Sequence, residues 1–393
     1  MHQDPFRHLK YLRESLSQDN EPIGFFVSAG CPLSVDMPDG LYPLIPDVKG
    51  LTQAINKDLE HNKKYKILTT ELLKASKSID NIEDILSFIR SLIIVSKGST
   101  VRGLSEGDLL SLETTICGII SSKLNVKLPD ENTPYHRLGK WVRSIDRKIP
   151  VEIFTTNYDL LVEQSLEDLQ VPYFDGFVGA RRSFFDLRAL EDNLIPTHWT
   201  RLWKIHGSIN WYQEQGLEEK VVYRSSEIKE NASHLIYPSH LKYEESRKMP
   251  YLALIDQLSR FIRRKSSLLV LSGYSFNDNH INDTIVNALK ANPTAMVLGL
   301  MYGQFLTDDK ETYPHAYRLA RQQHNLNVWT FDTAIIGTNE GTWEYPEVPE
   351  DAHTLKEFVH NASDPTSPTQ VKLGNFSEFT SFLQRFIGSG SSV

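Results

Sequence analysis

The sequence is poor in cysteine, because only Cys31 and Cys117 occur among its 393 residues. Two cysteines exclude a disulfide framework and a four-cysteine zinc module, and they fit a reducing cytosol. The sequence also lacks any run of about 18 apolar residues, so no membrane span is predicted. Its first residues are charged and do not form the apolar core of a signal peptide, so we expect a soluble cytoplasmic protein.

An excess of positive charge is absent as well. Lysine and arginine number 42 against 50 aspartates and glutamates, which gives a net charge of −8. The two signs are interspersed, so we expect neither direct nucleic-acid binding nor attraction to an anionic membrane. The dinucleotide fingerprint GxGxxG is missing, which disfavours a dehydrogenase.

Short apolar runs alternate with longer stretches of helical period. This pattern predicts an α/β fold, a Rossmann-like parallel sheet with helices on both faces. The expected strands are residues 23–29, 151–157, 201–207, 266–274, 294–301 and 325–332. Several of them end in Ser, Thr, Asn, His or Gly. Because ligands bind at the carboxyl ends of strands in such sheets, these polar residues form the candidate site.

A segment of purely helical character separates the first two strands. Apolar residues recur at spacings of three and four over residues 50–135, and Ser105 with Asp108 predicts a capping box. We therefore expect a helical insertion subdomain at 50–135 within a main domain made of 1–49 and 136–345. Pro134 suits the first position of a helix that leads to the second strand. Residues 346–393 are expected to form a Pro-rich linker, a short amphipathic helix and a flexible tail.

Four motifs directly follow predicted strands: SAGCP with MPDG close behind (28–40), TTNYD (155–159), KIHGSINW (204–211) and SGYSFNDNHIN (272–282). Each motif alone has an ordinary structural interpretation. SAGCP suits a turn, His206 a core histidine, and Asn157 and Asp159 strand-end caps. Asp278 is predicted to cap the following helix. No second ligand stands at a suitable spacing from His280, so no metal site is predicted.

Together, the order and spacing of the motifs resemble the sirtuin-like NAD-binding family. Ser28 to Asp39 matches the spacing of that family's first motif without a gap. TTNYD corresponds to its Thr-Gln-Asn-x-Asp motif, His206-Gly207 to its His-Gly pair, and Gly273-Tyr274-Ser275 to its Gly-x-Ser motif. TTNYD, IHGSINW and GYSFNDNHIN are similar to the bacterial antiphage-defence branch rather than to the protein deacylases.

The sequence also departs from the family pattern. Ser28 and Asp36 replace glycines, Pro32 replaces a serine, and Gly40-Leu41 stand where deacylases carry Phe-Arg. The zinc-binding cysteines are missing, so no zinc is expected. In the deacylases that zinc module helps to form the cleft for an acylated peptide. The resemblance therefore implies NAD binding without deacylation.

The resemblance implies an NAD glycohydrolase that releases nicotinamide and ADP-ribose and depletes NAD in antiphage defence. It assigns His206, Asn157 and Asp159 to catalysis. It assigns Ala29, Gly30, Asp39, Gly273 and Ser275 to NAD binding. An alternative is a sensor that binds NAD or ADP-ribose and returns it intact. The family also implies a homo-oligomer and a separately encoded partner, first of all a HerA-type hexameric ATPase.

Overall fold

The computed structural model describes residues 2–130, 132–215, 220–225, 234–236, 250–345, 347, 349, 353–360, 369–385 and 387. The tail expected at 388–393 and most of the Pro-rich linker lie outside these residues. Among the described residues, no helix combines the length and apolar character that a bilayer span requires.

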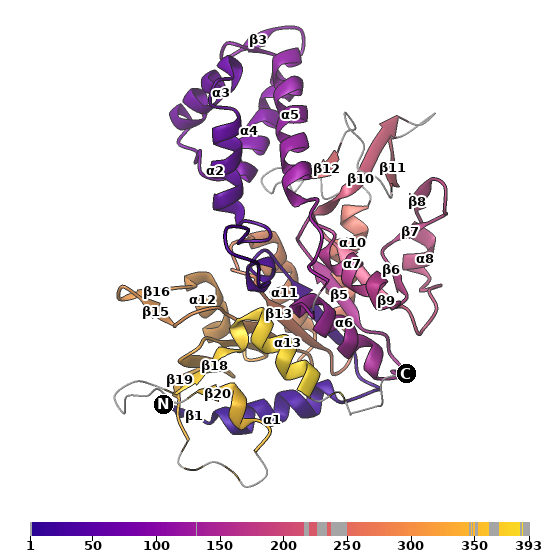
Figure 1. Ribbon diagram of the computed structural model, residues 1–393, viewed down its shortest axis with the longest axis vertical. Helices are drawn as coiled ribbons and strands as arrows, with labels where there is room; N and C mark the ends of the chain where they lie inside the picture. Colours follow the sequence, from indigo (N-terminus) through magenta and orange to yellow (C-terminus); the bar gives the residue numbers. More distant parts are fainter. Residues whose placement is uncertain are drawn as a thin grey trace.

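A ten-stranded sheet forms the centre of the molecule, in the order β1-β19-β18-β17-β14-β13-β2-β5-β9-β6 (Figure 1). Every strand expected from the sequence is present in it: β2 (Ile23–Val27), β5 (Glu152–Thr155), β9 (Thr200–Lys204), β13 (Leu268–Ser272), β14 (Met296–Leu300) and β17 (Leu326–Trp329). All of these strands run parallel. Numbered along the chain, their spatial order is 3-2-1-4-5-6, the order of the doubly wound dinucleotide-binding fold.

The edges of the sheet were not expected from the sequence. β6 (Tyr173–Phe174) lies beside β9 at one edge. At the other edge β18 (Thr333–Ile336) and β19 (Asn339–Trp343) run antiparallel, and β1 (His2–Gln3) pairs with β19. The start of the chain is thereby held against a strand some 340 positions away, which no local pattern indicates.

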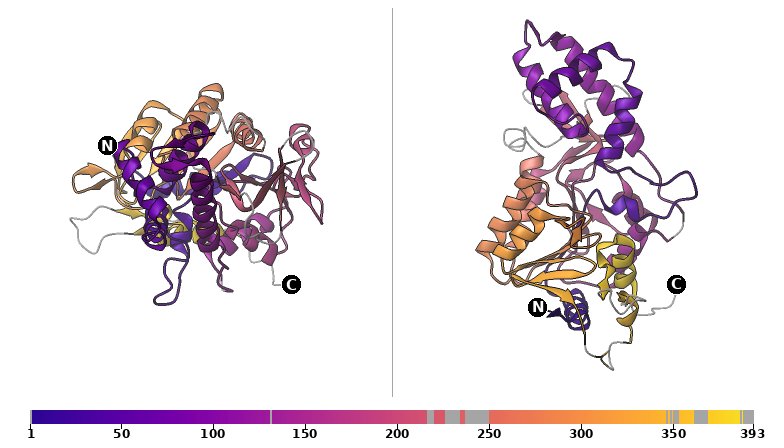
Figure 2. Two further views of the ribbon diagram at one scale, coloured as in Figure 1. Left: turned by 90° about the horizontal axis from the view of Figure 1, so that it is seen from above. Right: turned by 90° about the vertical axis from the view of Figure 1, so that its left-hand side faces the viewer.

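Helices cover both faces of the sheet, as expected, because successive side chains of each central strand enter two different cores. Phe25 and Val27 pack in one core, and Phe26 packs in the other. The first core includes α1 (Pro5–Leu16), α6 (Pro134–Ser144), α7 (Leu161–Asp168) and α13 (Phe376–Arg385). The second includes α10 (Tyr251–Ile262), α11 (Asn279–Ala291) and α12 (Pro314–Gln322) (Figure 2). Strands buried on both faces explain the unbroken apolar runs of the sequence.

A helical layer projects from one end of the sheet, at the top of Figure 1. It consists of α2 (Val48–Asp58), α3 (Lys63–Lys74), α4 (Ile82–Val95) and α5 (Glu106–Leu124), with a small hairpin of β3 (Thr100–Val101) and β4 (Leu104–Ser105). The predicted capping box is confirmed, since Ser105 and Asp108 bond reciprocally at the start of α5. Pro134 occupies the first turn of α6, as predicted.

A second, antiparallel sheet follows the order β12-β10-β11-β8-β7. Its strands are β7 (Phe177–Val178), β8 (Ser183–Phe185), β10 (Gly207–Gln215), β11 (Lys220–Arg224) and β12 (His234–Ile236), and α8 (Leu187–Glu191) follows β8. Two short hairpins complete the described strands, β15 (Leu306–Thr307) with β16 (Lys310–Glu311) and β20 (Val359–His360) with β21 (Gln370–Val371). This second sheet was not anticipated from the sequence.

The short C-terminal helix α13 packs against α6. The guanidinium of Arg137 donates to the Ser377 hydroxyl at 2.7 Å, and the rings of Tyr135 and Phe376 lie 5.3 Å apart. The apolar face of this helix is therefore covered within the chain rather than left for a partner.

Candidate functional site

The candidate site lies where the strand order of the sheet reverses. After β2 the chain continues toward β5 on one side, and after β13 it continues toward β14 on the other side. The two departing loops remain bonded to each other: Ser28 N donates to Ser272 O, and Gly30 N donates to Gly273 O, both at 3.0 Å. A crevice at the carboxyl ends of the strands, at this switch point, is where doubly wound sheets bind ligands.

Two glycines allow the loops to approach this closely. Gly273 adopts φ +67°, and a Cβ added there would lie 2.6 Å from Cys31 N. A Cβ on Gly30 would lie 2.8 Å from the Cα of Gly273. The thiol of Cys31 donates to Ser272 O at 3.2 Å, and burial raises its pKa to about 12. Cys31 is thus a neutral structural residue and no nucleophile.

We expect Gly273→Ala to destabilise the protein by about 2–3 kcal/mol, because it adds a collision with backbone atoms to an unfavourable positive φ. Gly98→Ala is the matched control. Gly98 has φ +72° but open space around its Cα, so its cost should be about 1 kcal/mol. Urea unfolding followed by tryptophan fluorescence measures both variants, and equal midpoints would contradict the close-approach argument.

The TTNYD loop after β5 is fixed by its own side chains and by its neighbours. The Thr155 hydroxyl accepts from Asn157 N, and Asp159 Oδ1 accepts from Leu161 N, both at 3.0 Å. The Asn157 side chain also donates to the Asp159 carboxyl group. Burial raises the pKa of Asp159, while Lys204 and these hydrogen bonds oppose that effect. The Ser28 and Thr156 hydroxyls meet at 2.7 Å and join this loop to the first one.

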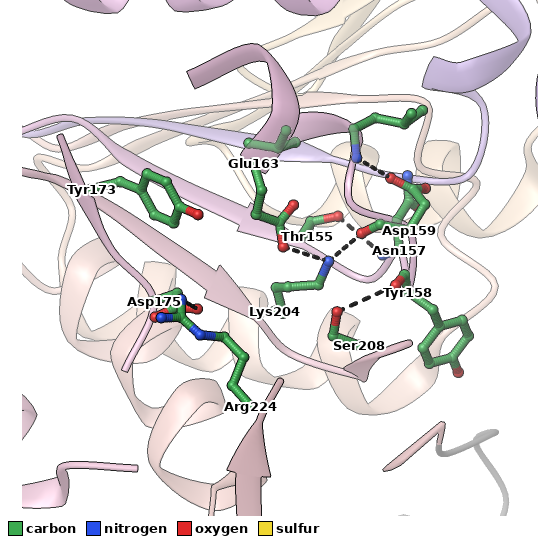
Figure 3. Close-up of polar contacts among 12 residues, drawn as sticks. Thr155, Asn157, Tyr158, Asp159, Glu163, Tyr173, Asp175, Lys204, Ser208 and Arg224 are labelled. Carbon is green, nitrogen blue, oxygen red and sulfur yellow. Dashed lines mark hydrogen bonds and ion pairs between the residues drawn. The ribbon is translucent and has the colours of Figure 1, made fainter. Parts of the chain in front are cut away.

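Lys204 supports the TTNYD loop from below. Its side chain is 1 % exposed, and its ammonium group donates to the Asp159 carbonyl and, at 2.9 Å, to Glu163 Oε1 (Figure 3). Burial raises the pKa of Glu163, and the charge of Lys204 opposes that rise. No role was predicted for Lys204 from the sequence, although a lysine inside the apolar strand RLWKI was a detectable signal.

His206 follows β9 and lies against the segment after β13. Its Nε2 is 3.3 Å from Asp278 Oδ2, and both side chains are largely buried, 11 % and 14 % exposed. The Tyr158 ring lies 6.5 Å from the imidazole, centroid to centroid. Asp278 also caps α11, as predicted, because its Oδ1 accepts from His280 N and Ile281 N. Its contact with His206 was not foreseen.

A cavity of about 340 Å³ brings several of the predicted residues together. Its floor contains Ala29, Asn157, Asp159, His206 and Ser275. Its opposite wall comes from the helical layer and is mainly apolar, with Leu51 of α2, Ile82 and Leu86 of α4, and Ile120 and Leu124 of α5. Asn81 and Glu83 add polar groups to this wall. No sequence motif identified these helical residues as part of the site, since they lie outside the four motifs.

A second cavity of about 540 Å³ adjoins the first on the other side of the two loops. Gly30, Gly273 and Lys49 line it, and Ala29, Tyr274 and Ser275 line both cavities. Asp39 is the exception among the predicted residues. It is exposed in a turn and lines neither cavity. Among the residues that the structure describes, no group of three His, Cys, Asp or Glu side chains is arranged to hold a metal ion.

Residues 151–326 match a family model described as the SIR2-like domain. The matched region is a little under half of the chain. It includes TTNYD, His206 and the Gly273 loop, but neither the first loop nor the helical layer. No curated protein matches the sequence. A solved structure titled "Structural Basis for the Mechanism and Regulation of Sir2 Enzymes" is similar with 11 % identity and a TM-score of 0.36, over 77 % of this chain and 88 % of that chain.

Proposed function

We propose that the protein binds NAD across the two adjoining cavities and hydrolyses it to nicotinamide and ADP-ribose. The observation that carries this proposal is the composition of the 340 Å³ cavity. His206 and Asn157 line it together with three acidic residues, Glu83, Asp159 and Asp278, and its described lining contains no lysine or arginine. A cavity of this charge suits a cationic pyridinium ring and the positive charge that develops on the ribose when the ring departs.

The reaction itself places few demands on the protein. The bond between ribose C1′ and the pyridinium nitrogen breaks, and its electron pair neutralises the ring, so nicotinamide leaves without a proton. Water then adds to C1′ and loses a proton to a base. The imidazole of His206 suits the role of that base, and Asn157 donates and accepts hydrogen bonds to orient the water or the ribose. The apolar wall from the helical layer limits access by other water molecules.

The other end of NAD would occupy the 540 Å³ cavity. The close pair of glycines lets a pyrophosphate approach the backbone. Lys49 brings a positive charge to the same cavity, and the Asp47 carboxylate, which also lines it, accepts from Gly50 N as the cap of α2. Ser275, which lines both cavities, would contact the middle of the molecule. Asp39, assigned to NAD by the sequence resemblance, would reach the substrate only if its exposed turn moved over the cavity.

Control of this activity is a second part of the proposal. An enzyme that hydrolysed NAD continuously would deplete its own cell, which fits a role in antiphage defence under an external trigger. The helical layer supplies one wall of the cavity, so a partner or a second copy that shifts this layer would change the site. We propose that the protein forms a homo-oligomer. We propose a HerA-type hexameric ATPase as the first separate partner to test.

The test is nicotinamide release, measured by liquid chromatography. We expect NAD to yield equal amounts of nicotinamide and ADP-ribose, with the purified protein alone or after addition of the ATPase or of nucleic acid. Calorimetry with NAD serves as the control for binding. If NAD binds but is recovered intact under every condition, the protein is a sensor rather than a hydrolase. If NAD does not bind, both functions are excluded.

A further inference from the structure

We propose that Asp278 is a positioning residue that fixes the proton of His206 on Nε2 and so leaves Nδ1 as the nitrogen that accepts protons. The proposal deepens the proposed hydrolase function and rests on it for the kinetic consequences. It begins from the 3.3 Å contact between His206 Nε2 and Asp278 Oδ2. An ionised carboxylate can only accept hydrogen bonds, so the contact is favourable when Nε2 carries hydrogen. In the neutral imidazole, Nδ1 then holds the free electron pair.

The two oxygens of Asp278 have separate tasks. Oδ1 accepts from the first backbone N–H groups of α11, at 3.0 Å from His280 N and 3.2 Å from Ile281 N. This capping interaction fixes the carboxylate plane and leaves Oδ2 facing the imidazole. A helix cap therefore sets the orientation of a group that lines the proposed reaction cavity.

The segment that carries Asp278 is itself held firmly. The Tyr274 hydroxyl lies 3.2 Å from the Asp278 carbonyl and 2.9 Å from Asn282 Oδ1. The Asn282 amide donates to the Phe276 carbonyl at 2.8 Å. Tyr274 belongs to the Gly-Tyr-Ser motif. The loop that contacts Gly30 through Gly273 therefore also supports Asp278, the partner of His206. Such fixed supporting contacts are what a catalytic imidazole needs in order to keep one orientation.

Replacement by asparagine separates the cap from the contact with His206. The backbone N–H groups of α11 require an oxygen, so the side-chain oxygen of Asp278→Asn should keep the cap. Its NH₂ group must then face His206 Nε2 and will donate to it. The proton of the imidazole should move to Nδ1, and the nitrogen that is meant to accept protons becomes blocked.

The test has two readouts, of which one does not require activity. In protein labelled with ¹⁵N-histidine, the signals of His206 are assigned by their loss in His206→Gln. We expect hydrogen on Nε2 in the wild type and on Nδ1 in Asp278→Asn. In the NAD assay we expect kcat of Asp278→Asn to fall about 10- to 100-fold with little change in KM, the usual cost of losing a partner that orients a functional histidine. Asp4→Asn, which alters the analogous cap of α1 far from the cavity, should change neither readout.

The outcomes separate the two proposals. Wild-type protein that never releases nicotinamide contradicts the hydrolase function, while the tautomer of His206 still tests the role of Asp278. A wild-type tautomer with hydrogen on Nδ1 overturns the positioning role. So does an Asp278→Asn variant that keeps both the tautomer and the wild-type kcat. Thermal unfolding checks that Asp278→Asn is folded. We expect it to unfold near the wild-type temperature, because asparagine is as good a helix cap as aspartate.

Discussion

Nicotinamide release by His206→Ala should be about 10²- to 10⁴-fold slower than release by the wild type, because positioned general bases contribute about this much to catalysis. His206 is the one imidazole among the described residues that line the 340 Å³ cavity, and Asn157, Asp159 and Asp278 surround the same space. Alanine removes the group that accepts the proton of water. It leaves the Asp278 cap of α11 and both glycine loops unchanged.

The matched control for this prediction is His198→Ala. His198 is exposed and lines neither cavity, so its variant should retain the wild-type rate. Calorimetry should show that His206→Ala still binds NAD, since the glycine loops and Ser275 remain. If His206→Ala and His198→Ala release nicotinamide equally fast, His206 has no catalytic role and the base must be sought elsewhere in the cavity.

The strands of the main sheet and the helices that cover it could be predicted because each is indicated by a local sequence pattern. A strand buried on both faces reads as an unbroken apolar run, as in LLVLS of β13. Helix starts are marked by capping residues such as Ser105 and Asp278 and by a first-turn proline such as Pro134. The 3-2-1-4-5-6 strand order is a property of the assembled sheet and was not predicted from the sequence. This order places the loops after β2 and β13 side by side, and the motifs in these two loops had been assigned to one candidate site.

What the sequence did not reveal depends on contacts between distant segments. The helical layer contributes Glu83 and its apolar wall to the cavity only because α4 folds back over the strand ends. Asp278 was correctly predicted as a cap, but its second oxygen meets His206 across two strands of the sheet order. The antiparallel sheet from β7 to β12 was missed because β7, β8 and β12 span only two or three residues each, and because β8 pairs with β11, which lies far from it along the chain.

Lys204 illustrates how a missed residue decides the stability of the site. Lys204→Met should lower the free energy of unfolding by about 3–5 kcal/mol at neutral pH, the usual cost of removing one partner from a buried ion pair. The variant leaves the Glu163 carboxylate buried without its cation, and the Asp159 carbonyl loses its donor. The TTNYD loop, which holds Asn157, loses the same support, so the NAD hydrolase activity should fall with the stability.

The sign of the pH dependence distinguishes this mechanism from simple loss of packing. Burial already raises the pKa of Glu163, and Lys204 opposes that rise. Without Lys204 the pKa of Glu163 in the folded state rises further above its unfolded value. The folded variant then binds a proton that the unfolded chain does not bind. The loss of unfolding free energy in Lys204→Met, relative to the wild type, should therefore be largest above neutral pH. It should shrink as the pH falls toward the pKa of Glu163 in the unfolded chain.

Urea unfolding at several pH values, with two further variants, tests this prediction. Lys148→Met removes a surface pair with Asp19 in which the side chains are 75 % and 45 % exposed, so solvent screening should limit its cost to below about 1 kcal/mol. Lys204→Met with Glu163→Leu replaces the buried pair by apolar groups and should recover most of the lost stability. If Lys204→Met unfolds at the same urea concentration as Lys148→Met, or if the double variant is no more stable than Lys204→Met alone, the buried ion pair does not stabilise the loop that carries Asn157.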